Sequence, residues 1–201
     1  MLPGAMDRAR RIVATQVEQL SNLVEDFLDL AALARGTVNV RQEWIDVLPE
    51  IDAAVESCSW IFADSRHSLS RQIPAAPVHA YVDATRLRQV VTNLLDNACK
   101  HTPPGGEIRL SLETAGGHLE LRVEDNGEGI TSDQLPHVFD LFTRSGTVKG
   151  ATRGLGIGLA LVREIAELHG GNVDARSAGL GAGSAFIVRF PACRPTPAQR
   201  P

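Results

Sequence analysis

DATRLRQVVTNLLDNACKH, residues 83–101, is the stretch around which the rest of the chain is organised. Its apolar residues recur at the i, i+3, i+4 and i+7 spacing that is typical of a helix face buried in a core. They are Leu87, Val90, Val91, Leu94, Leu95, Ala98 and Cys99. Asp83 precedes the first turn, where an aspartate can cap a helix by accepting a bond from a backbone N–H. The stretch therefore predicts an amphipathic helix packed into a core.

The opposite face of this helix carries a polar stripe, because four residues recur at steps of three or four. The stripe consists of Gln89, Asn93, Asn97 and Lys100, and no acidic residue lies along it to pair with the lysine. Amide oxygens suit a hard cation, and an ammonium group suits phosphate. From this helix alone, a ligand site and an ordinary solvated face are equally good interpretations.

Composition and charge bound the class of protein. With 201 residues, 43% of them hydrophobic, the chain has room for one sizeable domain and an appendage. A formal net charge of −4 gives no electrostatic basis for binding nucleic acid. Three distant cysteines match no metal spacing, so we expect reduced thiols and a cytoplasmic location. No apolar run reaches the roughly 18 residues of a membrane helix, although a longer parent with an anchor is compatible with this.

The first 35 residues differ from the rest. Their apolar positions step alternately by four and three residues, which forms a heptad seam. The seam consists of Val13, Val17, Leu20, Val24, Phe27, Ala31 and Ala34. One helix cannot bury this stripe alone, so residues 1–35 are expected in a helical bundle, with folding back onto the main domain as the alternative. Residues 37–191 would form the main domain, and the Pro-rich residues 192–201 a linker or tail.

Periodicity in the main domain predicts alternating strands and helices. Strands are expected at residues 37–45, 68–73, 78–82, 108–113, 119–124, 172–177 and 184–190. Besides residues 83–101, helices are expected at residues 46–63 and 158–169. Thr131 and Gln134 predict a capping box that begins a further short helix.

Residues 125–129, DNGEG, directly follow a predicted strand. Asn-Gly is a strong hairpin signal, so a plain turn is one interpretation. The capped helix that is predicted next, in place of a returning strand, favours another interpretation. Glycines at alternate positions allow the backbone to approach a flat ligand, and the carboxylate of Asp125 can accept a bond from an exocyclic amine.

Residues 154–158, GLGIG, begin a predicted helix after a loop whose charges are all positive. The start of a helix presents unpaired N–H groups that bind phosphate, whereas the hinge of a flexible lid is the alternative interpretation. The spacing is not G-x-G-x-x-G, and no Gly-Lys-Ser follows. Both a Rossmann dinucleotide site and a P-loop are therefore excluded.

Four segments occur in order along the chain: NLLDNACKH, EDNGEGI, FDLFTR and GLGIGLALVREIAELHGG. This ordered set resembles the N, G1, F and G2 boxes of sensor histidine kinases, in the ATPase superfamily that includes gyrase, the Hsp90 chaperones and the MutL repair proteins. The resemblance covers roughly residues 37–191. It implies an α/β (α+β) two-layer sandwich of the Bergerat type, with helices on one face of a mixed sheet. The N-terminal helix looks like the second helix of the dimerisation and phosphotransfer hairpin in those kinases.

The resemblance also implies a site for ATP and Mg²⁺. Asn97 would ligate Mg²⁺, Asn93 and Lys100 would contact the phosphates, and the basic segment from residue 144 to residue 153 would be a mobile lid. Asp125 would receive the adenine amino group, and Ser184 would reach adenine through water. The implied ATP-binding residues are Asn93, Asn97, Lys100, His101, Asp125, Gly127, Gly129, Ile130, Arg144, Lys149, Arg153, Gly154, Leu155, Gly156, Gly158 and Ser184.

The implied activity is transfer of the ATP γ-phosphate to a histidine, for relay to an aspartate of a response regulator receiver domain, in a parent protein that is a homodimer. The phosphoacceptor motif itself, a histidine followed by an acidic residue and then Thr-Pro, is missing. His101-Thr102-Pro103 lacks the acidic neighbour. We therefore expect the acceptor histidine on a helix that is absent from this sequence.

Three alternatives to the kinase remain. An ATPase like gyrase or Hsp90 needs a carboxylate base one turn before the metal-binding asparagine, where this chain has Asn93, which cannot take a proton. A non-catalytic module for nucleotide binding or dimerisation is the second. An anti-sigma-factor serine kinase is the third, and that class normally lacks the heptad helix.

Overall fold

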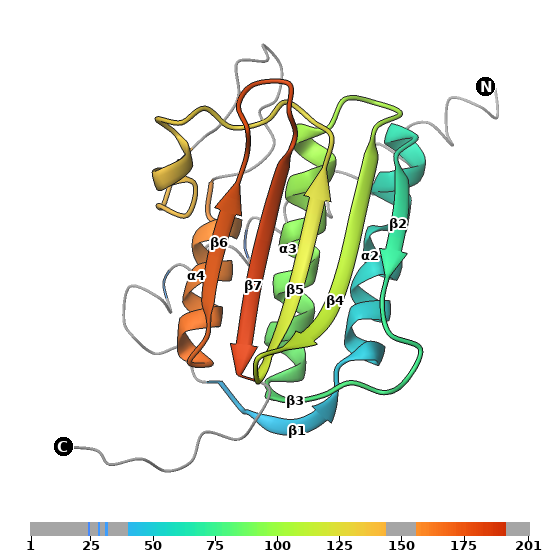
Figure 1. Cartoon of the computed structure of the whole chain (residues 1–201), viewed down its shortest axis with the longest axis vertical. Helices are drawn as coiled ribbons and strands as arrows, with labels where there is room; N and C mark the ends of the chain where they lie inside the picture. Colours follow the sequence, from blue (N-terminus) through green and yellow to red (C-terminus); the bar gives the residue numbers. More distant parts are fainter. Residues whose placement is uncertain (1–23, 25–27, 29–30, 32–39, 144–155, 192–201) are drawn as a thin grey trace, which may run out of the picture. The chain divides into compact units, whose positions relative to one another are not determined.

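The computed structural model describes residues 24, 28, 31, 40–143 and 156–191 (Figure 1). The chain divides into two units, Met1–Val38 and Asn39–Pro201. In the part that the structure describes, no helix is both long enough and apolar enough to cross a membrane.

The first unit is described at three residues only. Val24, Leu28 and Ala31 are helical, and the side chains of Val24 and Leu28 are 57% and 61% exposed. The other positions of the predicted heptad helix lie outside the described residues, as does the predicted tail at residues 192–201.

The second unit is built on a five-stranded sheet of order β2-β4-β5-β7-β6. The strands are β2 (Ser68–Gln72), β4 (Glu107–Ala115), β5 (His118–Asp125), β6 (Asn172–Arg176) and β7 (Ser184–Pro191). β2 pairs in parallel with β4, whereas the other neighbours pair antiparallel, so the sheet is mixed.

Three helices form the second layer: α2 (Leu48–Ser65), α3 (Ala84–His101) and α4 (Gly158–Leu168). Figure 1 shows all three on one face of the five-stranded sheet. A separate antiparallel pair joins β1 (Glu43–Asp46) to β3 (His79–Val82), and η1 (Leu135–His137) is a short 3-10 helix. The predicted α/β two-layer sandwich, with a mixed sheet covered on one face by helices, is confirmed.

The central helix α3 buries the seven side chains that its periodicity predicts. Leu94 and Leu95 are fully buried, and full burial of such a side chain stabilises the fold by about 1.5–3 kcal/mol. The predicted N-cap is also confirmed, because the Asp83 carboxylate accepts a bond of 3.0 Å from the backbone N–H of Arg86. Packing of the apolar face therefore fixes the direction in which the polar stripe points.

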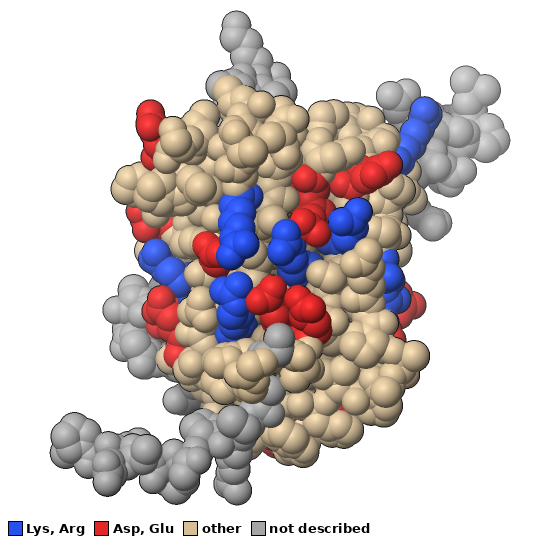
Figure 2. Space-filling view, in the orientation of Figure 1, with Lys and Arg blue, Asp and Glu red and all other residues tan. Residues whose placement is uncertain are grey.

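The open face of the sheet is covered by paired charges (Figure 2). Along β5, Leu121 is buried towards the helices, while its neighbours Glu120 and Arg122 face the opposite side. Each of these charged residues has a partner: the Arg122 guanidinium donates to Glu124 at 2.7 Å, and Arg189 donates to Glu120 at 2.7 Å. The helix-free face thus carries mainly charged side chains, and it also holds Ile187 of β7, which pairs with Arg122 and is 1% exposed.

The strand expected at residues 37–45 is observed as β1 (Glu43–Asp46); residues 40–42 are not part of it, and residues 37–39 lie outside the described residues. The short helix expected after Thr131 is the three-residue 3-10 helix η1. The Thr131 hydroxyl accepts the N–H of Gln134 at 3.4 Å, which is one half of the predicted capping box.

Two of the three cysteines are described, and both are free and buried. Burial raises the pKa of the Cys58 thiol to about 11 and that of the Cys99 thiol to about 12. Such thiols stay protonated and unreactive at neutral pH. Cys193 lies outside the described residues.

A buried histidine ties the end of α4 to the beginning of α3. The Nε2 atom of His169 accepts the backbone N–H of Asp83 at 3.0 Å, and its Nδ1–H donates to the carbonyl of Ile165 at 2.7 Å. The ring lies edge-on to Phe190 with centroids 5.4 Å apart, and the residue is 3% exposed. Burial lowers the pKa of His169, because protonation would charge a desolvated ring and remove its acceptor.

We predict that His169 makes stability fall with acidity. Because the folded state holds this histidine at a lowered pKa, only the unfolded chain readily takes the proton, and the free energy of unfolding should decrease as pH falls below about 6.5. His169→Leu should cost about 1–3 kcal/mol at pH 7.5 and make the decline towards pH 5.5 shallower. Urea unfolding at several pH values measures both effects, with exposed His118→Gln as control. An equal decline in His169→Leu and wild type would contradict this.

Candidate functional site

A cavity lies at the end of the sheet where β5 stops, and Asn97 is the residue of the polar stripe that lines it. In Figure 1 this end of β5 is at the top. The cavity has a volume of about 60 Å³, well below the ~300–1,000 Å³ of small-molecule sites, so it is too small to enclose a whole nucleotide. Five of the predicted site residues line it: Asn97, His101, Gly129, Ile130 and Ser184. Five further lining residues were not predicted: Glu128, Val138, Thr143, Leu159 and Phe186.

Asp125 ends β5 with both carboxylate oxygens engaged. Oδ1 accepts the N–H of Gly127 at 2.8 Å, and Oδ2 accepts the hydroxyl of Ser184 at 2.5 Å. These bonds fix the orientation of the carboxylate, and each oxygen keeps a further lone pair that can accept from a ligand amine. In the protein, Ser184 thus has a direct bond to Asp125, which the sequence did not indicate.

The two glycines after Asp125 are required by the protein's own backbone. A Cβ on Gly127 would lie 2.2 Å from the carbonyl oxygen of His101. Gly129 has a φ of +70°, and a Cβ there would lie 2.0 Å from the carbonyl oxygen of Gly179. The sequence predicted that these alternate glycines allow close approach of a flat ligand, and this stays a prediction; the close neighbour that the structure shows is the protein's own backbone.

Hydrogen bonds hold this loop between α3 and the β6–β7 connection. The N–H of Glu128 donates to the carbonyl of His101 at 3.0 Å, and the N–H of Gly181 donates to the carbonyl of Glu128 at 2.7 Å. The Ser177 hydroxyl accepts the N–H of Ile130 at 2.9 Å. Ser177 was missed from the sequence, because its partner is 47 residues away and no local pattern marks it.

Asn93, one helical turn before Asn97, lies beside Gly158, the first residue of α4. A Cβ on Gly158 would be 3.3 Å from Asn93 Oδ1. The Nδ2 atom of Asn93 is buried and has no hydrogen-bond partner among the described residues. A buried donor without an acceptor costs free energy, so it indicates a place for an acceptor such as a phosphate oxygen.

Lys100 has a partner, contrary to the expectation of an unpaired lysine. Its Nζ forms an ion pair with Asp96 one turn earlier, and the two side chains are 31% and 32% exposed. Asp96 lies four residues before Lys100, a spacing that places both side chains on one side of the helix, so the expectation of a stripe without an acid was wrong. A partly exposed pair of this kind contributes only about 0–1 kcal/mol, so Lys100 can exchange it for another anion.

The glycine-rich segment before α4 is described from Gly156 onward. Gly156 has a φ of +72°, and its carbonyl accepts the N–H of Phe142 at 3.0 Å. The first turn of α4, which begins at Gly158, presents the positive end of a helix next to Asn93. Five predicted site residues lie outside the described residues: Arg144, Lys149, Arg153, Gly154 and Leu155.

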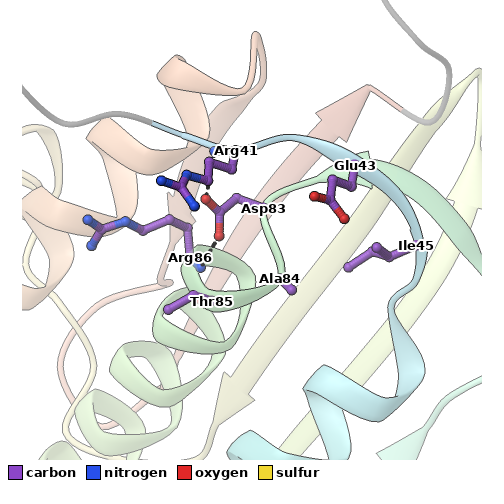
Figure 3. Close-up of a pocket in the computed structure, with 7 residues that line it drawn as sticks. All are labelled: Arg41, Glu43, Ile45, Asp83, Ala84, Thr85 and Arg86. Carbon is purple, nitrogen blue, oxygen red and sulfur yellow. Dashed lines mark hydrogen bonds between the residues drawn. The ribbon is translucent and has the colours of Figure 1, made fainter.

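A larger cavity of about 430 Å³ lies at the opposite end of α3 (Figure 3). Its lining includes two cations, Arg41 and Arg86, and two anions, Glu43 and Asp83. The carboxylate of Asp83 already accepts the backbone N–H groups of Arg86 and Arg41. None of the predicted site residues lines this cavity, and its charges are balanced, so its size does not make it the candidate site.

Comparison with known proteins gives the family. Residues 82–194 match the family described as histidine kinase-, DNA gyrase B-, and HSP90-like ATPase. The signal transduction histidine-protein kinase AfsQ2 of Streptomyces coelicolor is 33% identical over 92% of this chain and 33% of its own length. The structure of the Acinetobacter baumannii histidine kinase AdeS has a TM-score of 0.71 at 26% identity, covering 92% of this chain and 84% of that chain.

The structure of full-length ShkA in complex with AMPPNP has a TM-score of 0.76 at 25% identity, covering 94% of this chain and 40% of that chain. The present chain spans less than half the length of the curated relatives that it matches. It belongs to the histidine kinase-, DNA gyrase B- and HSP90-like ATPase family. Within that family it is an ATP-binding catalytic domain of the sensor histidine kinase type.

We predict that Gly129→Ala destabilises the domain by about 2–5 kcal/mol, since it adds a backbone clash to the cost of a left-handed conformation. Gly116→Ala is the matched control, because Gly116 has a φ of +58° and no atom within 4 Å of the added Cβ. The control should cost only about 1–2 kcal/mol. Chemical denaturation compares the two variants, and equal losses would contradict the clash.

Proposed function

We propose that this chain binds Mg²⁺ and ATP between α3, the loop after β5 and the start of α4, and that it serves as the catalytic part of a protein-histidine kinase. The observation that carries the proposal is the buried, unpartnered Nδ2 of Asn93 beside the first turn of α4. An amide donor and the positive end of a helix at one place suit a polyphosphate. The AMPPNP complex of ShkA supports the same class of ligand.

The purine would lie at the opposite end of the site. Asp125 is held by Gly127 and Ser184 and retains acceptor capacity for an exocyclic amine. The cavity beside it has apolar walls, which include Ile130, Val138 and Phe186 and which suit a flat ring. Donor and acceptor positions therefore favour adenine at this end and phosphates near Asn93.

The residues present fit a magnesium ion that is held mainly by the substrate. Within the described ranges, no three His, Cys, Asp or Glu side chains gather into a metal site. The Asn97 side chain lines the cavity and has no bond there to a described residue, so its amide oxygen is available as one ligand. Mg²⁺ commonly takes one or two protein ligands together with phosphate oxygens and waters. When bound, the ion would neutralise phosphate charge.

The chain's own part in the reaction is positioning. Phosphoryl transfer needs alignment and charge neutralisation more than covalent help from the protein. Asn93 and Lys100 would orient the phosphates, and Arg144, Lys149 and Arg153 would add positive charge. With an amide at residue 93, no side chain there can activate water. These features favour transfer to an external imidazole over rapid hydrolysis.

The remainder of the proposal concerns the whole protein. Residues 1–35 would be the second helix of a dimerisation and phosphotransfer hairpin, residues 37–191 the catalytic domain, and residues 192–201 a linker. The parent would be a homodimer that relays the phosphoryl group to a response regulator. This domain would lie in the cytoplasm, where ATP is available.

We predict that Asn97→Ala weakens Mg²⁺-dependent ATP binding about tenfold or more, because charge-assisted contacts contribute ~1.5–3 kcal/mol. Asn172→Ala, at an exposed position on β6, is the control and should bind as the wild type does. Titration calorimetry with and without Mg²⁺ measures both. Unchanged affinity in Asn97→Ala would remove this residue from the site.

We predict slow ATP hydrolysis by the chain alone and no self-labelling from γ-³²P-ATP. Addition of the parent's complete dimerisation hairpin should restore acid-labile labelling of that hairpin, because a neutral imidazole is a good nucleophile. Asp125→Asn should suppress the transfer. Rapid turnover by the chain alone would instead indicate a gyrase- or Hsp90-like ATPase, and acid-stable self-labelling would indicate a serine kinase.

A further inference from the structure

Glu128 lines the cavity, and both its backbone N–H and its backbone carbonyl are hydrogen-bonded to other segments. Its N–H donates to the last residue of α3, His101, and its carbonyl accepts from Gly181 in the β6–β7 connection. The neighbouring Gly127 and Gly129 pack so closely that a Cβ on either would lie within 2.2 Å of another backbone oxygen. The backbone that carries the Glu128 side chain is therefore held by hydrogen bonds and by close packing.

The carboxylate of Glu128 has unused acceptor capacity. The side chain lines the cavity and is 31% exposed. Among the described residues its one polar neighbour is His101, whose Nδ1 lies 3.7 Å from Oε2, which is beyond hydrogen-bond distance. An ionised carboxylate has about four lone-pair sites on two oxygens and can accept two hydrogen bonds side by side. The feature therefore suits a ligand with two adjacent donors.

The spacing of residues on α3 gives the distance between the two ends of the proposed site. Asn93, Asn97 and His101 follow one another at intervals of four residues, so Asn93 and His101 are separated by about 12 Å along the helix axis. The phosphate-side residue Asn93 is at one end of this span, and His101 with Glu128 is at the other. A carboxylate would repel phosphates, and this separation keeps it away from them.

We propose that Glu128 recognises the vicinal 2′- and 3′-hydroxyls of the ribose and so selects ribonucleotides. This inference rests on the proposed function, because it needs a nucleotide between Asp125 and Asn93. The sugar connects the purine end to the phosphate end, and its two adjacent O–H donors match the two carboxylate oxygens. Glu128 thus touches the ligand and determines specificity.

The test compares ATP with 2′-deoxyATP and 3′-deoxyATP by titration calorimetry on the full chain. For each variant, the ratio of the deoxynucleotide Kd to the ATP Kd is taken, so that a general loss of fold or affinity cancels. Wild type should give a ratio of about ten for each analogue, at the low end for hydrogen bonds to a charged group. Glu128→Gln, which keeps one neutral acceptor, should lower the ratio to about three, and Glu128→Ala should bring it to about one.

Glu113→Gln is the matched control. Glu113 lies on β4, five residues from Ile108, which pairs with Asp125, so it is about 17 Å along the strand from the site. This variant should keep the wild-type ratio. A wild-type ratio near one, or an unchanged ratio in Glu128→Ala, overturns the ribose assignment while ATP binding persists. A wild-type chain that binds none of the three nucleotides overturns the proposed function together with this inference.

Discussion

Burial of one face of α3 is the constraint on which the rest of the domain depends. Seven apolar side chains of this helix are buried in the core, so the helix cannot rotate without exposing them. Asn93, Asn97 and His101 lie away from that face, and their direction is therefore a consequence of the hydrophobic core. Both ends of the helix are also bonded to other segments, through Asp83 and His169 at its beginning and through the carbonyl of His101 at its end. Packing of the core thus fixes the direction in which these polar side chains point.

The loop after β5 and the end of α3 together line the cavity, with residues 128–130 on the loop and Asn97 and His101 on the helix. In this loop, Glu128 is bonded to α3 on one side and to the β6–β7 connection on the other. The domain therefore brings together segments that are far apart in sequence at one edge of the sheet. The opposite cavity also joins distant segments, but its charges are balanced and none of the predicted site residues lines it. Residues 82–194, which match the histidine kinase-, DNA gyrase B- and HSP90-like ATPase family, include the segments that meet at this edge.

Features that depend on local spacing were predictable from the sequence. The buried face of α3 and its Asp83 cap follow from a 3.6-residue period and a capping residue, and both are confirmed. Features that depend on distant segments were not predictable, because no local pattern marks Ser177 as a partner of Ile130 or His169 as a partner of Asp83. The Lys100–Asp96 pair was predictable, because an i,i+4 spacing places the two side chains together on one side of the helix, and the expectation of an unpaired lysine was wrong. Glycine spacing was recognised, but whether it serves a ligand or the protein's own backbone requires coordinates.

The charged open face of the sheet has a consequence for crowding. Because arginines and glutamates alternate and pair within this face, their fields cancel over a few ångströms, and little attraction extends beyond the ~10 Å Debye length. Two copies that meet through these faces would have to strip water from groups that are already paired, and they would gain few new contacts in return. Such a surface is inert towards itself. Copies of the domain that collide through this face at high local concentration would therefore separate again.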